Sequence, residues 1–246
     1  MPKLVISEIK KTLGTLLTLQ EISIQAEEGT VVGILGPSGC GKTTLLHIVA
    51  GLMVPDSGKV MINDKDVTGS PGYVSYMQQK DLLLPSRTVI DNVSIPLVLQ
   101  GIPAREARAR ASAYLARFGL EGFENYYPRQ LSGGMRQRAA ILRTYLFSSD
   151  ILLFDEPFAA LDAITRARMN TWLVDVLNEL GPTVLLVTHD VDEALHLCNK
   201  IYVLSDCPTR IKLVTEVPFY RSSNMRTITD PLYQTTRDSI LDSLSV

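Results

Sequence analysis

The sequence predicts an α/β fold built on a mostly parallel sheet. Two wholly apolar runs, 151–154 and 184–187, are typical of strands that are covered on both faces in such a sheet. A third β-rich run, 30–35, ends at a glycine-rich stretch and is followed by a helical pattern at 42–50. Strands that alternate with helices in this way predict parallel neighbours joined by helical crossovers.

Further elements continue this alternation. Residues 163–180 predict a helix that ends at Gly181-Pro182, and Asp190 is suited to cap the helix that follows the 184–187 strand. A short strand is expected at 72–77.

The two ends of the chain predict additional β structure. Residues 3–9 and 16–26 alternate between apolar and polar side chains, which indicates a small antiparallel sheet in an N-terminal subdomain. In the tail, about 206–246, we expect a strand at 211–217 and a helix at 227–244.

The middle of the chain changes character and predicts an inserted helical subdomain at about 85–145. Residues 103–118 are rich in Ala and Arg, and Ser132 is a suitable N-cap for a helix that extends to Tyr145. We expect residues 1–246 to form a single domain that contains this insertion.

Composition narrows the possible classes of function. Hydrophobic residues make up 46% and charged residues 20% of the chain, which is ordinary for a folded protein with a sizeable core. The net charge of −2 argues against bulk electrostatic binding of nucleic acid. Three cysteines without metal-ligand spacing are consistent with a reducing compartment. We expect neither a signal peptide nor a membrane span, because no run approaches about 20 apolar residues.

Residues 36–44 match the phosphate-loop pattern G-x-x-x-x-G-K-[ST] in full, and a strand and a helix flank them as that motif requires. The pattern predicts a P-loop NTPase core, in which backbone N–H groups converge on phosphate oxygens. Lys42 would reach the β- and γ-phosphates, and Thr43 would offer its hydroxyl to Mg²⁺. The residues predicted to bind the nucleotide here are Gly36, Pro37, Ser38, Gly39, Cys40, Gly41, Lys42, Thr43 and Thr44.

Polar side chains follow the predicted strands at the edge where parallel sheets bind ligands. Asp155 and Glu156 end the 151–154 strand, and adjacent strand residues point in opposite directions, so we expect them to have different roles. Asp155 would hold Mg²⁺ and Glu156 would orient or deprotonate an attacking water. His189 ends the next strand, and Gln79 follows the 72–77 strand. A solvated acidic turn, a structural histidine and an ordinary loop glutamine are the alternative interpretations.

The stretch Leu131-Ser132-Gly133-Gly134-Met135 predicts a second anion site. A Ser-Gly-Gly turn that opens a helix offers free backbone N–H groups at the positive end of a helix dipole. Two such sites in one chain indicate either two ligands or one ligand shared between two copies.

Together these motifs resemble the nucleotide-binding subunit of ATP-binding cassette (ABC) transporters, and the resemblance covers nearly all of residues 1–205. The 131–135 stretch is the signature of that family. It occurs here with the phosphate loop, the Asp155-Glu156 pair, Ala160-Leu161-Asp162 and His189, and no other P-loop class carries this set.

The resemblance implies that two chains dimerise head to tail, with each ATP between the phosphate loop of one chain and the signature of the other. In that arrangement Ser132, Gly133 and Gly134 contact the nucleotide held by the partner, and Asp162 braces the dimer. The remaining implied roles are general base for Glu156, contact with the γ-phosphate and water for His189, and contact with Mg²⁺ for Gln79, which relays its state to the helical subdomain.

The resemblance also implies partners and a location. The 79–93 segment is similar to importers of nitrate, sulfonates, taurine and thiamine-type pyrimidines, in which the region after the glutamine docks a short cytoplasmic helix of the permease. This implies ATP-driven import of a small polar solute at the cytoplasmic face of the membrane. The implied partners are permease subunits and, indirectly, an extracytoplasmic solute-binding protein, with no nucleic acid. An exporter subunit, a soluble cassette ATPase of DNA repair or translation, and a small-molecule kinase are the alternatives.

Three features depart from the family or add to it. The importer group usually has Phe-Gln and a Trp after the proline, whereas this chain has Gln78-Gln79 and Pro85-Ser86. The stretch 13–16 lacks the aromatic residue on which adenine usually stacks, so we expect weaker discrimination between bases. Cys40 lies near a helix N-terminus and Lys42, which predicts a reactive thiolate that ATP would protect.

Overall fold

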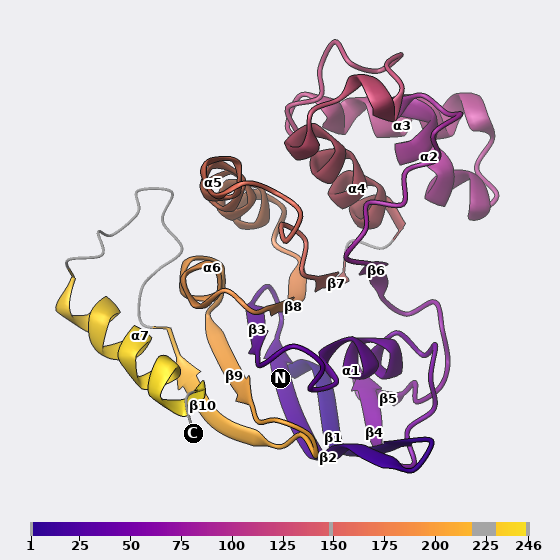
Figure 1. Cartoon of the computed structure of the whole chain (residues 1–246). Helices are drawn as coiled ribbons and strands as arrows, with labels where there is room; N and C mark the ends of the chain where they lie inside the picture. The colour runs from indigo at the N-terminus through magenta and orange to yellow at the C-terminus, as the bar shows by residue number, and fades with distance from the viewer. Residues whose placement is uncertain (1, 148–149, 218–229, 245–246) are drawn as a thin grey trace.

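A computed structural model describes residues 2–147, 150–217 and 230–244. One of its two sheets is antiparallel and has the strand order β2-β1-β4-β5 (Figure 1). The long hairpin of β1 (Pro2–Leu13) and β2 (Leu16–Glu27) confirms the predicted N-terminal strands. Strands β4 (Ser57–Ile62) and β5 (Lys65–Asp66), which extend this sheet, were not predicted from the sequence.

The second sheet has six strands in the order β10-β9-β3-β8-β7-β6. All neighbouring pairs from β9 to β6 are parallel, and only β10 runs antiparallel to β9, so the predicted mostly parallel sheet is confirmed. Its strands are β3 (Val31–Leu35), β6 (Ser75–Met77), β7 (Ile151–Asp155), β8 (Thr183–Thr188), β9 (Lys200–Leu204) and β10 (Ile211–Glu216).

Alternate residues of β3 face two different cores. Val32 and Ile34 pack with α1 (Lys42–Val49) and the inner face of the antiparallel sheet. Val31 and Leu35 face the opposite core, which α5 (Ala163–Leu180) and α6 (Val191–Leu197) help to fill. This two-sided burial explains why the parallel strands lack alternating polar residues.

The crossover helix α5 has the predicted bounds because its capping residues are unambiguous. Asp162 accepts a hydrogen bond from the backbone N–H of Thr165 at 2.9 Å, and Gly181 ends the helix with φ of +66°. A residue in this left-handed conformation is most easily a glycine. Asp190 caps α6 in the same way by accepting from the N–H of Glu193 at 3.0 Å, as the sequence predicted.

Helices α2 (Val89–Leu99), α3 (Ala104–Leu115) and α4 (Gly133–Phe147) pack together into a unit beside the six-stranded sheet, which α4 contacts at β6 (Figure 1). This is the inserted helical subdomain expected from the sequence. Ser132 accepts from the N–H of Met135 at 3.3 Å, as expected for an N-cap. A short 3-10 helix, Pro128–Gln130, precedes it.

The tail forms β10 and α7 (Pro231–Leu244). The strand was predicted, and α7 corresponds to most of the predicted helix, although residues 227–229 lie outside the described part. Ile240 of α7 is fully buried, and both Tyr233 and Arg237 donate to Asp192 of α6. In the described part of the chain, no helix is long and apolar enough to cross a membrane.

Candidate nucleotide-binding site

The phosphate loop connects the buried strand β3 to α1. Gly41 adopts φ of +107°, and a Cβ there would lie 2.9 Å from Cγ2 of Thr18, so a larger residue would be both strained and crowded. Lys42 is buried, and its Nζ donates to the carbonyls of Gly36 and Pro37 at 2.8 Å each. The ammonium group is therefore held inside the curve of the loop.

Thr43 and Asp155 form the predicted metal-binding pair, and the structure brings them together. The Thr43 hydroxyl donates to Oδ2 of Asp155 at 3.0 Å, and the hydroxyl of Tyr76 donates to the same oxygen at 3.1 Å. Burial raises the pKa of the Asp155 carboxyl, and the bonds from Thr43 and Tyr76 oppose that rise. Tyr76 was not predicted from the sequence, and only its place in β6, the strand beside β7, could have indicated it.

Glu156 points to different partners from Asp155, as predicted from their adjacency. It lies just after β7 with φ of +47°, and its N–H donates to the carbonyl of Val187 at 2.9 Å. Its Oε2 lies 3.2 Å from Nδ1 of His189 and accepts from the amide nitrogen of Gln79 at 3.4 Å. Three predicted catalytic residues, which follow β6, β7 and β8, thus meet at one oxygen.

The signature turn packs against the start of α5. A Cβ on Gly133 would lie 3.1 Å from Leu161, and one on Gly134 would lie 3.4 Å from Thr165. These contacts place the turn beside Asp162, while α4 and α1 belong to separate parts of the molecule (Figure 1). The structure therefore brings Ser132, Gly133 and Gly134 next to the Asp162 turn and not to the phosphate loop of the same chain.

Cys40 corrects one expectation. Its side chain is almost completely buried, and this burial raises the pKa of the thiol more than Lys42 and the backbone hydrogen bond lower it. The predicted reactive thiolate is therefore wrong, because the sequence showed the cation and the helix start but not the desolvation. The backbone of Cys40 has a different contact, since its carbonyl accepts a hydrogen bond from the hydroxyl of buried Thr209.

The edge expected to receive the base is an apolar hairpin tip. Leu13 is the last residue of β1 and Leu16 the first of β2, and their side chains are 40% and 58% exposed. The turn between them, Gly14-Thr15, carries no aromatic side chain.

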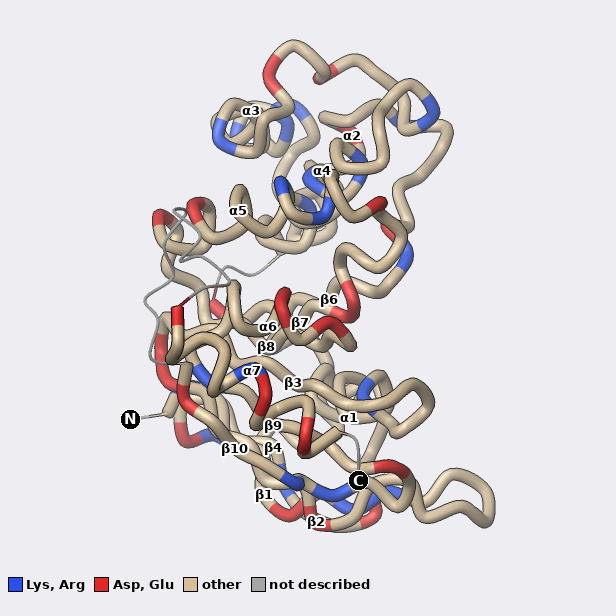
Figure 2. Tube along the Cα trace, turned by 60° about the vertical axis from the view of Figure 1, so that its left-hand side comes forward, with Lys and Arg blue, Asp and Glu red and all other residues tan. Residues whose placement is uncertain are grey.

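Acidic positions gather around β6 and β7 and basic ones along α3 and α4 (Figure 2). A site that handles phosphates thus has acidic residues at the strand ends, where a metal ion and water would be held, and cationic residues in the helical subdomain. The described residues contain no group of three or more His, Cys, Asp or Glu side chains able to hold a metal ion. The oxygens of Thr43 and Asp155 fit Mg²⁺, which is usually held by one or two protein oxygens together with phosphates and waters.

The family model described as ABC transporter matches residues 19–159, more than half of the chain. The chain belongs to the ABC transporter family. It is an ATP-binding and ATP-hydrolysing cassette, as the signature, the phosphate loop and the Asp155-Glu156 pair predicted.

Several relatives show how close the match is. The formylaminopyrimidine import ATP-binding protein of Halalkalibacterium halodurans is 42% identical over 81% of this chain and 78% of its own length. The taurine import ATP-binding protein of Yersinia pestis is 42% identical over 78% of this chain and 76% of its own length. These two relatives confirm the predicted resemblance to the pyrimidine and taurine importer group.

Among solved structures, a bacterial ABC transporter cassette in dimeric form is similar with a TM-score of 0.74 and 31% identity. The similarity covers 88% of this chain and all of that one. The same cassette in a post-hydrolysis state bound to ADP and Pi matches with a TM-score of 0.73.

Proposed function

We propose that this cassette, taken as one nucleotide-binding domain over residues 1–246, powers the import of a small polar solute. It would act as a head-to-tail dimer on the cytoplasmic face of the membrane, bound to permease subunits that receive solute from an extracytoplasmic binding protein. The observation that carries the proposal is the position of the signature turn, which lies beside Asp162 and apart from its own phosphate loop. Such a turn can complete a site only on another copy.

The residues at the strand ends would have separate roles in ATP hydrolysis. Glu156 is placed to take a proton from an attacking water, and His189, which approaches the same carboxylate, is placed to hold both the water and the γ-phosphate. Lys42 would exchange its loop carbonyl partners for β- and γ-phosphate oxygens. These groups orient reactants and stabilise charge, which is most of what phosphoryl transfer requires.

Mg²⁺ would be held by Thr43 and Asp155, with Gln79 on the other side of the site. When bound, the ion neutralises charge on the phosphates and fixes their orientation. The buried Asp155 carboxylate already accepts two hydroxyl hydrogen bonds, which keep its oxygen pointing toward Thr43.

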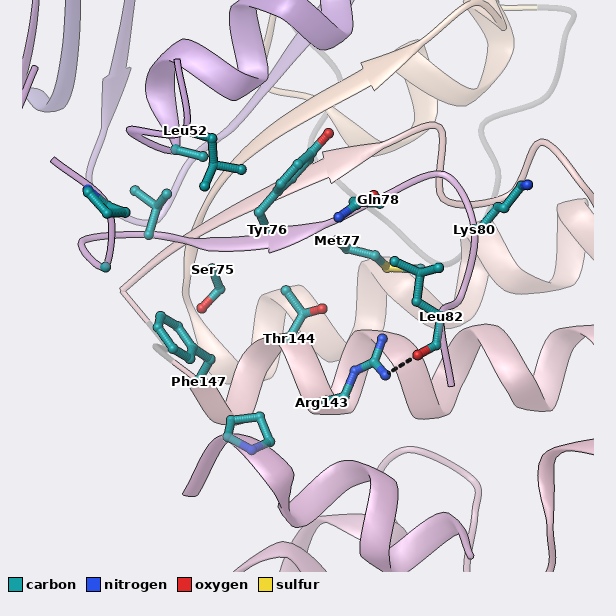
Figure 3. A pocket seen from close by; sticks show the side chains of 15 residues that line it. Leu52, Ser75, Tyr76, Met77, Gln78, Lys80, Leu82, Arg143, Thr144 and Phe147 are labelled. Carbon is teal, nitrogen blue, oxygen red and sulfur yellow. Dashed lines mark hydrogen bonds between the residues drawn. The ribbon is translucent and has the colours of Figure 1, made fainter. Parts of the chain in front are cut away.

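Docking of the permease is proposed at the groove between the helical subdomain and the sheets. This groove of about 350 Å³ lies beside β6 and the residues that follow Gln79. Leu52 and Leu82, 60% and 50% exposed, present apolar side chains along it, and Phe147 also lines it (Figure 3). A short amphipathic helix of a permease would bury these side chains.

The shared site is tested by mixing two inactive variants. Lys42→Ala removes the phosphate contact, and Ser132→Arg blocks the signature without touching the chain's own phosphate loop. A mixed dimer contains one intact site, formed by the loop of the Ser132 variant and the signature of the Lys42 variant. We therefore expect ATPase activity to return on mixing.

The matched control mixes Lys42→Ala with Glu156→Gln. Both of these residues act on the ATP bound to their own chain, so no intact site can form and no activity should return. If the first mixture stays inactive although both variants are folded and Ser132→Arg binds ATP, the shared-site proposal is wrong.

A further inference from the structure

The phosphate loop is contacted from outside by the turn between β9 and β10, residues 205–210, here called the β9–β10 turn. Thr209 of this turn is fully buried, and its hydroxyl donates to the carbonyl of Cys40 in the phosphate loop. The two residues are 169 positions apart in the sequence, so only the fold brings them together. The β9–β10 turn lies outside all the motifs that predicted the site.

The backbone of Thr209 is fixed on both sides. Its N–H donates to the carbonyl of Thr18 at 2.9 Å, and its carbonyl accepts from the N–H of Gln20 at 2.9 Å, so the residue forms a parallel bridge with β2 (Figure 1). The turn is closed by Ser205 and Arg210, because the N–H of Ser205 donates to the carbonyl of Arg210 and the N–H of Arg210 donates to Oγ of Ser205, both at 2.9 Å. A β-branched side chain on such a backbone has few rotamers, so the hydroxyl of Thr209 donates from a defined position.

The hydrogen bond from Thr209 sets the direction of the Cys40–Gly41 peptide. In a trans peptide the carbonyl and the N–H of the next residue lie in one plane and point in opposite directions. Because the Cys40 carbonyl points to Thr209, the N–H of Gly41 points away from the β9–β10 turn. In the described part of the chain that N–H donates to no backbone carbonyl, so a ligand can accept from it.

This peptide needs such a contact because a glycine follows it. Gly41 adopts φ of +107°, and glycine populates both signs of φ, so the peptide before it rotates at little cost. The groups that would lie nearest to a Cβ on Gly41, at 2.9 and 3.0 Å, are methyl groups of Thr18 and Leu19. Methyl groups restrict the space around Gly41 but cannot hydrogen-bond to the peptide. The hydroxyl of Thr209 supplies the polar contact that they lack.

We propose that Thr209 is a positioning residue for ATP binding, whose hydroxyl holds the Cys40–Gly41 peptide with its N–H turned into the phosphate loop to meet a phosphate oxygen. The loop is then preorganised, and binding does not have to include the cost of rotating this peptide. The inference rests on the proposed function only in taking residues 36–44 as the phosphate-binding loop. It requires neither the dimer nor import.

Two pairs of side chains at position 209 isolate the hydroxyl. Thr209→Val removes it from a side chain of the same shape, and Thr209→Ala differs from Thr209→Ser by the hydroxyl alone. The Kd of the full chain is measured by isothermal titration for two ligands, inorganic tripolyphosphate and a non-hydrolysable ATP analogue with Mg²⁺.

We expect loss of the hydroxyl to weaken both ligands equally. If about one molecule in ten keeps the binding orientation of the peptide, the apparent Kd rises about tenfold from Thr to Val and again from Ser to Ala. Thr209→Ser should bind both ligands as the unaltered chain does, although loss of its buried methyl group lowers the free energy of unfolding. The Ser and Ala pair keeps the experiment decisive if Thr209→Val does not fold.

Steady-state ATPase kinetics separate positioning from a general loss of structure. A loop that is less often in its binding orientation weakens the ground state and the transition state alike, so KM should rise about tenfold in Thr209→Val while kcat stays within about twofold.

The matched control is Thr183→Val. Thr183 is 1% exposed, and its hydroxyl accepts from the N–H of Gly29 at 3.0 Å. It begins β8, at the end of the parallel sheet opposite the phosphate loop. This variant should lower the free energy of unfolding and leave Kd, KM and kcat unchanged.

Lys42→Ala distinguishes a failure of this inference from a failure of the site. If Lys42→Ala leaves tripolyphosphate binding unchanged, the loop does not hold phosphates and both proposals are wrong. If it weakens that binding while folded Thr209→Val and Thr209→Ala keep the Kd values of their hydroxyl-bearing counterparts, only the role of Thr209 is wrong.

Two further outcomes would overturn the role of Thr209. An equal loss of affinity in Thr209→Ser would show that the methyl group, and not the hydroxyl, is responsible. A loss for the nucleotide but not for tripolyphosphate would show that Thr209 acts through β2 on the base and not through the loop on the phosphates.

Discussion

Oε2 of Glu156 lies 3.2 Å from Nδ1 of His189, and the two residues follow adjacent parallel strands, β7 and β8. Glu156 reaches this position because it leaves β7 in a left-handed conformation, while Asp155 keeps the strand conformation and points into the protein. Two adjacent residues with different backbone conformations thus direct one buried carboxylate toward Thr43 and a second carboxylate toward His189. This separation allows one acid to hold a metal ion and the other to handle a proton.

Replacement of Glu156 by Gln should separate ATP binding from hydrolysis. The amide keeps the size of the side chain and can still contact Gln79 and His189, but it cannot accept a proton. We expect ATP affinity to be retained, turnover to fall on the order of 10²- to 10⁴-fold, and ATP-bound dimer to accumulate. Equilibrium binding, steady-state ATPase rate and size-exclusion chromatography measure these three effects. Normal turnover in this variant would rule out Glu156 as the general base.

Tyr76→Phe should destabilise the fold through Asp155. The tyrosine hydroxyl donates to a buried carboxylate, and burial together with Asp155 raises the pKa of Tyr76, so it remains a donor throughout the neutral range. Loss of a hydrogen bond to a charged group costs about 1.5–3 kcal/mol, which urea unfolding would measure.

Tyr73→Phe is the matched control for this change. Tyr73 is more exposed, and its hydroxyl contacts the flexible ammonium group of Lys65. Its replacement should alter stability by about 0.5 kcal/mol or less. Equal effects at the two positions would mean that the Tyr76–Asp155 contact has no special contribution.

We predict that the cassette discriminates weakly between the nucleotide bases adenine and guanine. The hairpin tip offers the exposed aliphatic side chains of Leu13 and Leu16 in place of an aromatic ring. We expect the Kd values for ATP and GTP to differ by only a few fold, and Leu16→Tyr to strengthen ATP binding by about 1–3 kcal/mol through stacking. Isothermal titration with both nucleotides measures this directly. A strong preference of the unaltered chain for ATP would contradict the argument.

The sequence predicted best those elements whose ends carry clear capping residues and whose interiors have one consistent pattern. Helix α5 matched because Asp162 and Gly181 mark its ends. Helix α2 was not predicted, since it is apolar around most of its circumference and contains Pro96, a residue that normally argues against a helix. Strand β4 was not predicted, because its place in the sheet depends on pairing with distant β1, and β5 is a two-residue strand that pairs with β4.

The site was predicted as a set of residues and not as a geometry. Family motifs identified Gln79, Glu156 and His189, but only the fold shows that they meet at one carboxylate oxygen. Tyr76 had no motif to indicate it, and the chemistry of Cys40 depended on burial that local sequence does not encode. Long-range contacts and desolvation are thus what sequence reasoning could not supply.

Glu193 should make the stability of the cassette depend on pH. It lies on α6, four residues after His189, and burial raises its pKa from 4.5 to about 7. Asp190 adds to this rise, whereas the hydrogen bond with Thr188 and the charges of Arg166 and His189 oppose it. Oε1 of Glu193 is buried without a hydrogen-bond partner within the described ranges, which fits a carboxyl group that resists ionisation.

Between about pH 4.5 and 7 the folded state holds a proton that the unfolded chain has released. The contribution of Glu193 to the free energy of unfolding is therefore fully present below pH 4.5. It is lost as the pH rises through 7, and the total loss is on the order of 3 kcal/mol. Glu193→Gln cannot ionise and should remove this dependence. Urea unfolding of both proteins at pH 5 and pH 8 provides the measurement, with exposed Glu121→Gln as the control. Because Gln carries no charge to bury, the free energy of unfolding of the variant should rise relative to that of the unaltered chain on going from pH 5 to pH 8. If the free energies of unfolding of the two proteins instead differ by the same amount at both pH values, the pKa of Glu193 is not raised by folding.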